Sequence, residues 1–438
     1  MRTPHLPILL AALAAGLTSA QAKFTVHEWG TFTVLQAPDG AALSWYQGQN
    51  DVTPLPEFVT GNKAAAAARI AAADRPAMKA SEPIRINYAV RMETPVLYFY
   101  PDAPMDVKVT ADYPQGMITE AYPHPARKGS SATWQGKLLP VTPEELKTVP
   151  VADSAEGRHY TTARNVPDAW LFRMQPAATQ KEKIPAPETD HFIFYRGAGN
   201  NLSRMITAST NDDHSFQVTN QSPDTVPVLF LLHVVDGKSV WKRVDRMLPY
   251  KMIMDQEAIK NNRQPFYKEE GRLQVALPDA TEPFATSTPR LKAEMLGALE
   301  TEGLTKAEAA AMVATWDNLW FEESGTRILA VLPQPWVDTV LPLQITPKPD
   351  AMERVFVARM EMISVAQQNT LVDLLFKTPE NPASARDQLR KLSLGRFAAG
   401  AVDRAVALKT RQVDNDMRTR FAQLSSPPAT APVVGKAP

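Results

Sequence analysis

Proline limits the fold of this chain more than any other feature. The sequence holds 38 prolines and only 19 glycines, whereas a usual proline content of about 5% would give roughly 22. Because proline lacks a backbone N–H and fixes its own φ angle, it breaks helices and is tolerated at turns and strand ends. Most of the chain is therefore expected to be β-strand and loop.

The composition indicates a folded protein of ordinary type. Hydrophobic residues make up 44% of the 438 residues and charged residues 21%, which rules out wholesale disorder, and the length suffices for about two or three domains of roughly 100–200 residues. The predicted class is α+β, mainly β. We expect an antiparallel β-sandwich-like body that carries an inserted helical hairpin and a helical C-terminal segment.

Two helices are predicted after a long β-rich part. Leu291 and Leu299 belong to an apolar pattern of helical spacing, and Gly303 suits the end of that helix. Thr305 and Glu308 then form a capping box that opens a second helix. The expected organisation is a β-rich part over 23–285, a helical hairpin followed by returning strands over 286–366, a helical segment over 383–424, and a disordered proline-rich tail over 425–438.

The first 22 residues have the three-part layout of a secretory signal peptide. Arg2 supplies the positive start, Leu6 to Leu17 is the apolar run, and Ala20-Gln21-Ala22 is an A-x-A cleavage site. The apolar run is shorter than the roughly 20 residues of a membrane span. We therefore predict cleavage after Ala22 and export to a periplasm or to the exterior.

Charge and cysteine content exclude several functional classes. The 47 basic residues balance the 47 acidic ones, so no excess charge points to nucleic acid or to an anionic membrane. The absence of cysteine excludes disulfides, thiolate nucleophiles and cysteine metal sites. The longest later apolar run, Val226 to Val235, is too short to span a membrane, so no integral membrane segment is expected once the signal is removed.

The first candidate site residues are His27 and Glu28, near the start of the expected mature chain. A histidine beside a glutamate suggests a metal ligand and an acid–base group. On a strand, however, neighbouring side chains point to opposite faces, so one metal ion could not easily bind both. The sequence is also not H-E-x-x-H, because Thr31 stands four residues after His27. His27 is a metal-ligand candidate or a structural histidine, and Glu28 is a catalytic candidate.

The other candidates lie further along the chain. Arg91 and Glu93 share one face of a predicted strand, where they form either a structural ion pair or a poised carboxylate with its cation. Glu120 is a third catalytic candidate after the 114–116 turn. Arg196 ends a strand at a glycine turn, where it could bind an anionic group or hold a loop in place, and the second role is favoured. His191, near the start of that strand, is a second metal-ligand candidate.

Several stretches together resemble a family of uncharacterised exported bacterial proteins with an N-terminal HEWGTFT motif. The matching stretches are 27–33, 90–96, 193–197, 315–322, 337–338, 341–343, 354–357 and 394–398. The resemblance covers most of the expected mature chain up to about residue 400. It implies export and one shared architecture. It implies no activity, so no catalytic residue is carried over.

Two functional classes remain open at this stage. The first is an exported binding or structural protein without chemistry, which is slightly favoured. The second is a hydrolase on a β scaffold that uses carboxylates and a metal bound by His, Asp or Glu. The motifs G-x-S-x-G, G-x-x-x-x-G-K-[ST] and G-x-G-x-x-G before a helix are absent, and the sequence identifies no cofactor, substrate or partner. Convergence of the candidate residues on one pocket would favour the hydrolase.

Overall fold

The protein is an α+β protein in which strands predominate, as predicted: of the residues that the structure describes, 43% are in strands and 28% in helices. The computed structural model describes residues 23–45, 55–60, 88–126, 129–152, 157–175, 187–200, 205–254, 256–264, 267–376, 388 and 391–409. The predicted signal peptide and the predicted proline-rich tail lie outside these residues. The boundaries of the predicted segments stay predictions.

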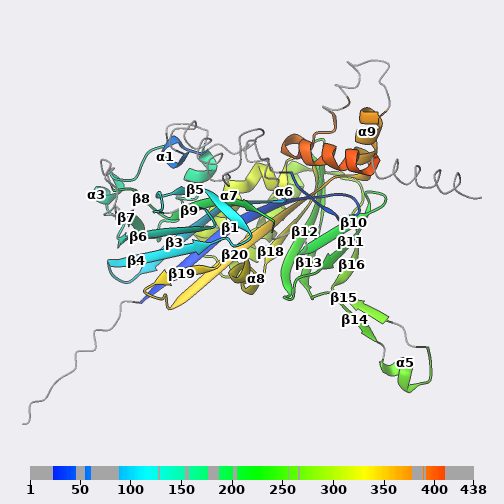
Figure 1. Cartoon of the computed structure of the whole chain (residues 1–438), viewed down its shortest axis with the longest axis horizontal. Coiled ribbons are helices and arrows are strands. Elements are labelled where there is room, and N and C mark those ends of the chain that lie inside the picture. Colours follow the sequence, from blue (N-terminus) through cyan, green and yellow to red (C-terminus); the bar gives the residue numbers. More distant parts are fainter. Residues whose placement is uncertain are drawn as a thin grey trace, which may run out of the picture.

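A mixed sheet of ten strands forms the centre of the molecule (Figure 1). Its order is β17-β13-β12-β18-β20-β1-β3-β9-β5, with β2 paired to β1. The strands are β1 (Phe24–Gln36), β2 (Ala42–Leu43), β3 (Val90–Pro101), β5 (Gly116–Tyr122), β9 (Ile193–Gly199), β12 (Val226–Val235), β13 (Lys238–Met247), β17 (Glu282–Pro283), β18 (Gly325–Leu332) and β20 (Ala351–Met362). In the middle of the sheet β1 and β20 are parallel, and the other pairings are antiparallel. The returning strands β18 and β20 thus lie at the centre of the sheet that the N-terminal strands begin.

Three smaller sheets accompany the central one. Five strands follow the order β19-β4-β6-β7-β8, three follow β10-β11-β16, and β14 pairs with β15 alone. Their bounds are β4 (Met105–Asp112), β6 (Ser131–Leu139), β7 (Leu171–Met174), β8 (Thr189–Asp190), β10 (Ile206–Thr210), β11 (Ser215–Asn220), β14 (Lys251–Met254), β15 (Tyr267–Glu270), β16 (Arg272–Ala276) and β19 (Leu343–Thr346).

The helices are short apart from the predicted hairpin. That hairpin is α6 (Phe284–Thr301) and α7 (Lys306–Phe321), which pack on each other. The remaining helices are α1 (Glu57–Thr60), α3 (Pro143–Leu146), α4 (Arg158–Thr162), α5 (Gln256–Lys260), α8 (Gln334–Val340), α9 (Val365–Phe376) and the 3-10 helix η1 (Gly395–Phe397). Residues 398–409 are also helical, within the predicted C-terminal helical segment. None of the helices in the described ranges combines the length and apolar character that a membrane span requires.

The molecule is built in three layers around two hydrophobic cores. One core lies between the central sheet and the five-stranded and three-stranded sheets. In it Phe32 of β1, Val109 of β4 and Phe216 of β11 are buried together. The other lies between the opposite face of the central sheet and helices α1, α4, α6 and α7, where Trp29 and Trp316 are buried. A third, smaller cluster packs α9 and residues 397–405 against the end of β1.

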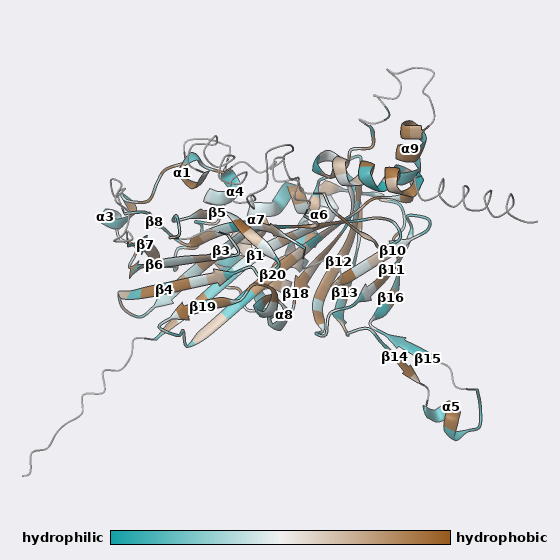
Figure 2. Ribbon diagram, viewed as in Figure 1, coloured by the Kyte–Doolittle hydropathy of each residue, from teal (hydrophilic) through white to brown (hydrophobic). Residues whose placement is uncertain are grey.

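The burial of each strand follows its layer. β12 is central and covered on both faces, so its sequence is almost continuously apolar. β4 lies in an outer sheet, and its residues alternate between buried Val107, Val109 and Ala111 and more exposed polar residues. The hydropathy colouring shows the same alternation along the outer strands (Figure 2).

The predicted capping box at the start of α7 is confirmed. Thr305 Oγ1 accepts a hydrogen bond from the Glu308 N–H at 3.2 Å, and Glu308 Oε2 accepts one from the Thr305 N–H at 2.7 Å. The two bonds satisfy N–H groups that have no partner inside the helix. The cap therefore fixes where the helix begins above the central sheet.

Candidate functional site

Glu28 lies in a buried ion pair between the parallel strands β1 and β20. Its register partner is Arg354, whose Nε donates to Glu28 Oε2 at 2.7 Å, and both side chains are fully buried. The Tyr195 hydroxyl donates to the other carboxylate oxygen. Burial, followed by the Glu28 charge, raises the pKa of Tyr195 well above its usual value. Both oxygens of Glu28 are thus already occupied.

Arg354 connects this pair to the surface. Its Nη1 donates to Asp338 Oδ1 at 2.8 Å, and the Asp338 side chain is 42% exposed. Burial opposes the charge of Arg354, but Glu28, Tyr195 and Asp338 together outweigh burial and raise the pKa of the guanidinium. The pair holds α8, which carries Asp338, against β20 and β1.

His27 contacts the capping carboxylate of α7. Its Nδ1 lies 2.9 Å from Glu308 Oε2, and the Tyr100 hydroxyl donates to Glu308 Oε1 at 2.5 Å. Burial raises the pKa of Glu308. The hydrogen bonds from His27, Tyr100 and the Thr305 N–H together lower this pKa by more, so it lies below its usual value. This arrangement ties the start of the helix to β1 and β3.

His191 lies apart from this contact, beside Asp190. The Asp190 carboxylate accepts hydrogen bonds from the Tyr160 hydroxyl at 2.7 Å and from the Arg164 guanidinium at 2.6 and 2.9 Å. Burial lowers the pKa of His191 and outweighs the opposite effect of Asp190. Within the described ranges, no group of three or more His, Asp or Glu side chains could hold a metal ion. His27 and His191 thus remain metal-ligand candidates that no described cluster supports.

Four predicted residues lie on neighbouring strands of the central sheet. Arg91 and Glu93 lie two residues apart on β3, and Glu120 of β5 is the register partner of Arg196 on β9. Arg91 Nη2 is 3.7 Å from Glu120 Oε2. Arg396 of η1 joins them, with Nη1 2.6 Å from Glu93 Oε1. We call these five residues the Glu93 cluster.

Glu93 is a buried, ionised partner within this cluster. Thr33 Oγ1 donates to its Oε2 at 2.5 Å, and only 1% of the Glu93 side chain is exposed. Burial raises the pKa of the carboxyl, but Arg396, Thr33 and Arg91 together lower it below its usual value. A carboxyl in this state is unsuited to donate a proton near neutral pH.

The backbone around the Glu93 cluster is irregular. The pairing register shifts within β1, β3 and β5 at this level of the sheet. Thr94, inside the β3 irregularity, has φ +46°, which is unusual for a β-branched residue. Such bulges are frequent beside active sites. The irregularity is the one observation that favours chemistry here.

Sequence reasoning missed Arg396 as a partner of Glu93, and it missed Arg359 and Glu361 in a second buried network. Arg396 lies about three hundred positions from Glu93, so no local pattern links them. In the second network Glu361 Oε1 accepts from Arg327 Nε at 2.6 Å and from Arg359 Nε at 2.8 Å. Arg359 and Glu361 lie two residues apart on one strand, so their side chains share a face, and this spacing could have predicted their pairing.

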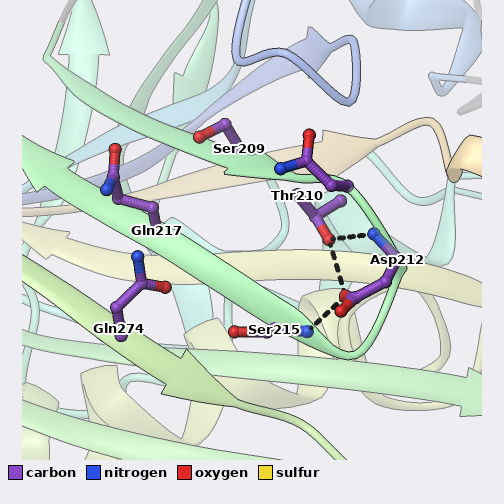
Figure 3. A pocket seen from close by; sticks show the side chains of 7 residues that line it. Ser209, Thr210, Asp212, Ser215, Gln217 and Gln274 are labelled. Atoms are coloured by element: carbon purple, nitrogen blue, oxygen red, sulfur yellow. Dashed lines mark hydrogen bonds between the residues drawn. The ribbon is translucent and has the colours of Figure 1, made fainter.

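A hollow lies elsewhere, on the outer face of the three-stranded sheet (Figure 3). Its volume is about 310 Å³, and it is lined by Ser209, Thr210, Asn211, Asp212, Ser215, Gln217 and Gln274. In the strand register Ser209 is opposite Gln217, and Gln217 is opposite Gln274. These three side chains therefore form one polar row across β10, β11 and β16.

The rim of the hollow is shaped by the loop between β10 and β11. Asp212 Oδ1 accepts hydrogen bonds from the backbone N–H groups of His214 and Ser215, each at 2.9 Å. These bonds stabilise the charged form and lower the pKa of Asp212. The next residue, Asp213, accepts from the Val365 N–H at 2.7 Å at the start of α9. The carboxylates thus fix the loop.

The hollow offers neutral hydrogen-bonding groups to a ligand. Within the described residues, no side-chain hydrogen bond involves Ser209, Asn211, Gln217 or Gln274. Each amide provides two donors and an acceptor, and each hydroxyl can donate and accept. The lining holds no histidine and no cation, and its one carboxylate is engaged in the loop. This set can bind and orient a polar ligand.

Sequence reasoning did not find the hollow. The alternation of Phe216 and Val218 with polar neighbours on β11 indicates one polar face, but it does not show that the face is hollowed. No protein-family model matches the chain, and no curated protein matches it. The resemblance to exported HEWGTFT-motif proteins therefore stays an expectation.

Proposed function

We propose that the protein is an exported, non-catalytic binding protein whose hollow binds a neutral, hydroxyl-rich ligand of the saccharide class. The observation that carries the proposal is the polar row of Ser209, Gln217 and Gln274, which is presented to solvent in a hollow and makes no side-chain hydrogen bond within the described chain. The predicted catalytic residues, in contrast, are paired inside the fold.

The chemistry of the lining selects the ligand class. An anion would need a guanidinium or ammonium group, and a cation would need free carboxylates. A sugar hydroxyl both donates and accepts, and the amides of Gln217 and Gln274 match both roles. The volume of about 310 Å³ lies at the lower end of the roughly 300–1,000 Å³ usual for ligand pockets. A sugar of one or two rings fits this size.

The ligand proposal is tested by saturation-transfer NMR on the purified protein with glucose, galactose, N-acetylglucosamine and maltose. At least one of these sugars should show transfer that is lost in the double variant Gln217→Ala/Gln274→Ala. Gln344→Ala is the matched control, because Gln344 is an exposed glutamine on β19 of the other outer sheet. No transfer from any sugar, or equal transfer with the double variant, would contradict the proposal.

Export is tested separately by N-terminal sequencing of the protein from the secreted or periplasmic fraction. The A-x-A site predicts a chain that starts Lys-Phe-Thr-Val at Lys23. An intact Met1 in the soluble fraction would contradict export.

A hydrolase that uses the Glu93 cluster is the second candidate function. The irregular backbone at Thr94 and the bulges on neighbouring strands favour it. A carboxylate held ionised by Arg396 would then act as a nucleophile or as an electrostatic stabiliser. Stability and hydrolytic activity measured on the Glu93→Gln variant distinguish this role from a structural one.

A further inference from the structure

A two-stranded arm projects from the body beyond the three-stranded sheet (Figure 1). It runs from residue 251 to residue 270 and consists of β14, the short helix α5 at its tip, and β15. In the described part of the chain, β14 and β15 make their extensive contacts only with each other. We call this segment the arm.

The base of the arm is tightly built. Gly271 has φ +70°, and a Cβ atom there would lie 2.4 Å from the Leu248 carbonyl oxygen, so only glycine fits. The backbone carbonyl of Asn220 accepts a hydrogen bond from the Tyr250 N–H at 2.7 Å, and the backbone N–H of Asn220 donates to the Gly271 carbonyl at 2.9 Å. Both chains of the arm are therefore attached to the end of β11.

Side chains reinforce the same junction. The Arg272 guanidinium lies 4.5 Å from the centre of the Tyr250 ring, and its Nη1 donates to Glu269 Oε1 at 2.8 Å. The Tyr250 hydroxyl donates to the same carboxylate oxygen at 3.1 Å. The direction of the arm is thus fixed before it meets any partner, which lowers the entropy cost of binding.

One face of the arm is largely apolar and exposed. Met252 and Met254 lie two residues apart on β14, and their register partners on β15 are Glu269 and Tyr267, so these four side chains share a face. The Glu269 carboxylate on this face is bound by Arg272 at the base of the arm. The exposed fractions of Met252, Met254 and Tyr267 are 57%, 36% and 55%, and Ile259 at the tip is 43% exposed. Brown bands mark β14 and the tip helix α5 in Figure 2. A two-stranded hairpin alone is at best marginally stable in water, so this face indicates a partner.

The charge of the arm indicates what kind of partner covers it. Residues 251–270 contain four basic and four acidic side chains (Lys251, Lys260, Arg263, Lys268; Asp255, Glu257, Glu269, Glu270), so the arm is neutral, as is the whole chain. A strongly charged partner would be matched by an excess of the opposite sign. Methionine and tyrosine are enriched in protein interfaces, and homodimer interfaces are the more apolar ones. A second copy presents the same neutral, apolar face.

We propose that the arm mediates dimerisation: two copies of the chain pack their Met252, Met254 and Tyr267 faces against each other about a two-fold axis. The same surface then serves both subunits, as a two-fold interface requires. The hollow lies on the three-stranded sheet and not on the arm, so none of its lining residues belongs to the proposed interface.

Sedimentation-velocity and light-scattering measurements on the full chain, from about 1 to 100 µM, test the dimer. The wild-type protein should sediment as a dimer, and Met252→Lys/Met254→Lys should weaken the association at least tenfold. Leu146→Lys is the matched control, because Leu146 is similarly exposed, at 41%, on α3 at the opposite end of the molecule (Figure 1). It should leave the mass unchanged. Thermal unfolding of each variant confirms that the body remains folded.

Each other outcome overturns the proposal. A wild-type monomer at every concentration excludes arm-mediated dimers, and a dimer that survives the two lysines places the interface elsewhere. A monomer whose arm captures a different protein assigns the arm to another class of partner. Sugar binding by the hollow is measured independently, so its failure and the failure of the dimer are distinguishable.

Discussion

The ion pairs of the central sheet and the hollow on the three-stranded sheet are both built from polar side chains, but they differ in burial and in charge. Glu28, Arg354 and Glu93 are charged, almost fully buried and bonded to one another or to neighbours. Gln217 and Gln274 are neutral, and their side chains have no hydrogen-bond partner in the described chain.

This difference separates structural polarity from polarity that is available for binding. A buried charge without a partner is costly, so charges inside the fold are paired and contribute specificity and anchoring. Neutral amides at a solvated face cost little when unpaired, and they exchange water for ligand readily. In this protein the buried charged side chains therefore hold the layers together, while the neutral amides at the solvated face are available to bind a ligand.

The largest effect is expected from breaking the Glu28–Arg354 pair. Arg354→Met leaves the fully buried Glu28 carboxylate with only the Tyr195 hydroxyl, and loss of one partner of a buried pair costs about 3–5 kcal/mol. Urea unfolding of the variant measures this change. The double variant Glu28→Gln/Arg354→Met should recover much of the loss, because no uncompensated charge remains. If the double variant is less stable than Arg354→Met, the pair is not the source of the effect.

A smaller loss, of about 3 kcal/mol, is expected for Glu93→Gln, because Arg91 and Arg396 both lose a carboxylate partner. Unfolding of the variant in urea gives the value, and a carbohydrate- and ester-hydrolysis screen of the same preparation gives its activity. Stability that is held or raised, together with loss of a hydrolytic activity, would instead support the hydrolase. Unchanged stability together with unchanged activity would contradict both the structural and the catalytic role of Glu93.

The acid dependence of stability sharpens this assignment. The folded-state pKa of Glu93 lies below its usual value, so the pair contributes fully above the usual carboxyl pKa of about 4.3. The contribution is lost as the pH falls from there through the folded-state pKa. Between pH 6 and pH 3 the wild-type protein should therefore lose more stability than Glu93→Gln does. Equal slopes would place the carboxylate outside the ion pair.

The expected loss of stability from breaking the helix cap is smaller than that from the buried ion pairs and larger than that from the hollow. Thr305→Ala removes the acceptor for the Glu308 N–H at the start of α7 and should cost about 0.5–2 kcal/mol. The Glu308 carboxylate keeps its bonds from His27 and Tyr100, so the helix stays attached to the sheet. Chemical denaturation measures the shift, and an unchanged midpoint would argue against the cap.

Local signals made the capping box, the helical hairpin and the mainly β class predictable, because each depends on residues close together in the sequence. The same capping signal occurs at Ser364 and Gln367, where Ser364 Oγ accepts from the Gln367 N–H at 3.0 Å. It opens α9, which sequence reasoning overlooked. The parallel pairing of β1 with β20 could not be predicted, because no local pattern connects strands more than three hundred residues apart.

The candidate site residues show the same limit. The shared face of Arg91 and Glu93 follows from strand periodicity, but the contribution of Arg396 depends on the tertiary fold. The hollow was unpredictable for a further reason. Serine and glutamine on a strand are ordinary surface residues, and the hollow also needs the loop between β10 and β11, whose Asn211 and Asp212 line it.

The smallest effect on stability is expected where the effect on binding is greatest. Gln217→Ala and Gln274→Ala remove side chains from a solvated face, where substitutions usually change stability by less than about 0.5 kcal/mol. Neither amide makes a side-chain hydrogen bond within the described chain, so no buried group loses a partner. Urea midpoints of both single variants should match the wild-type protein while saturation transfer from the bound sugar is lost. A large loss of stability would show that the amides belong to the fold, and would remove the contrast between the hollow and the buried pairs. Retained stability with lost binding would establish this contrast. The opposite result is expected for Arg354→Met, a much less stable protein that still binds the sugar while it remains folded.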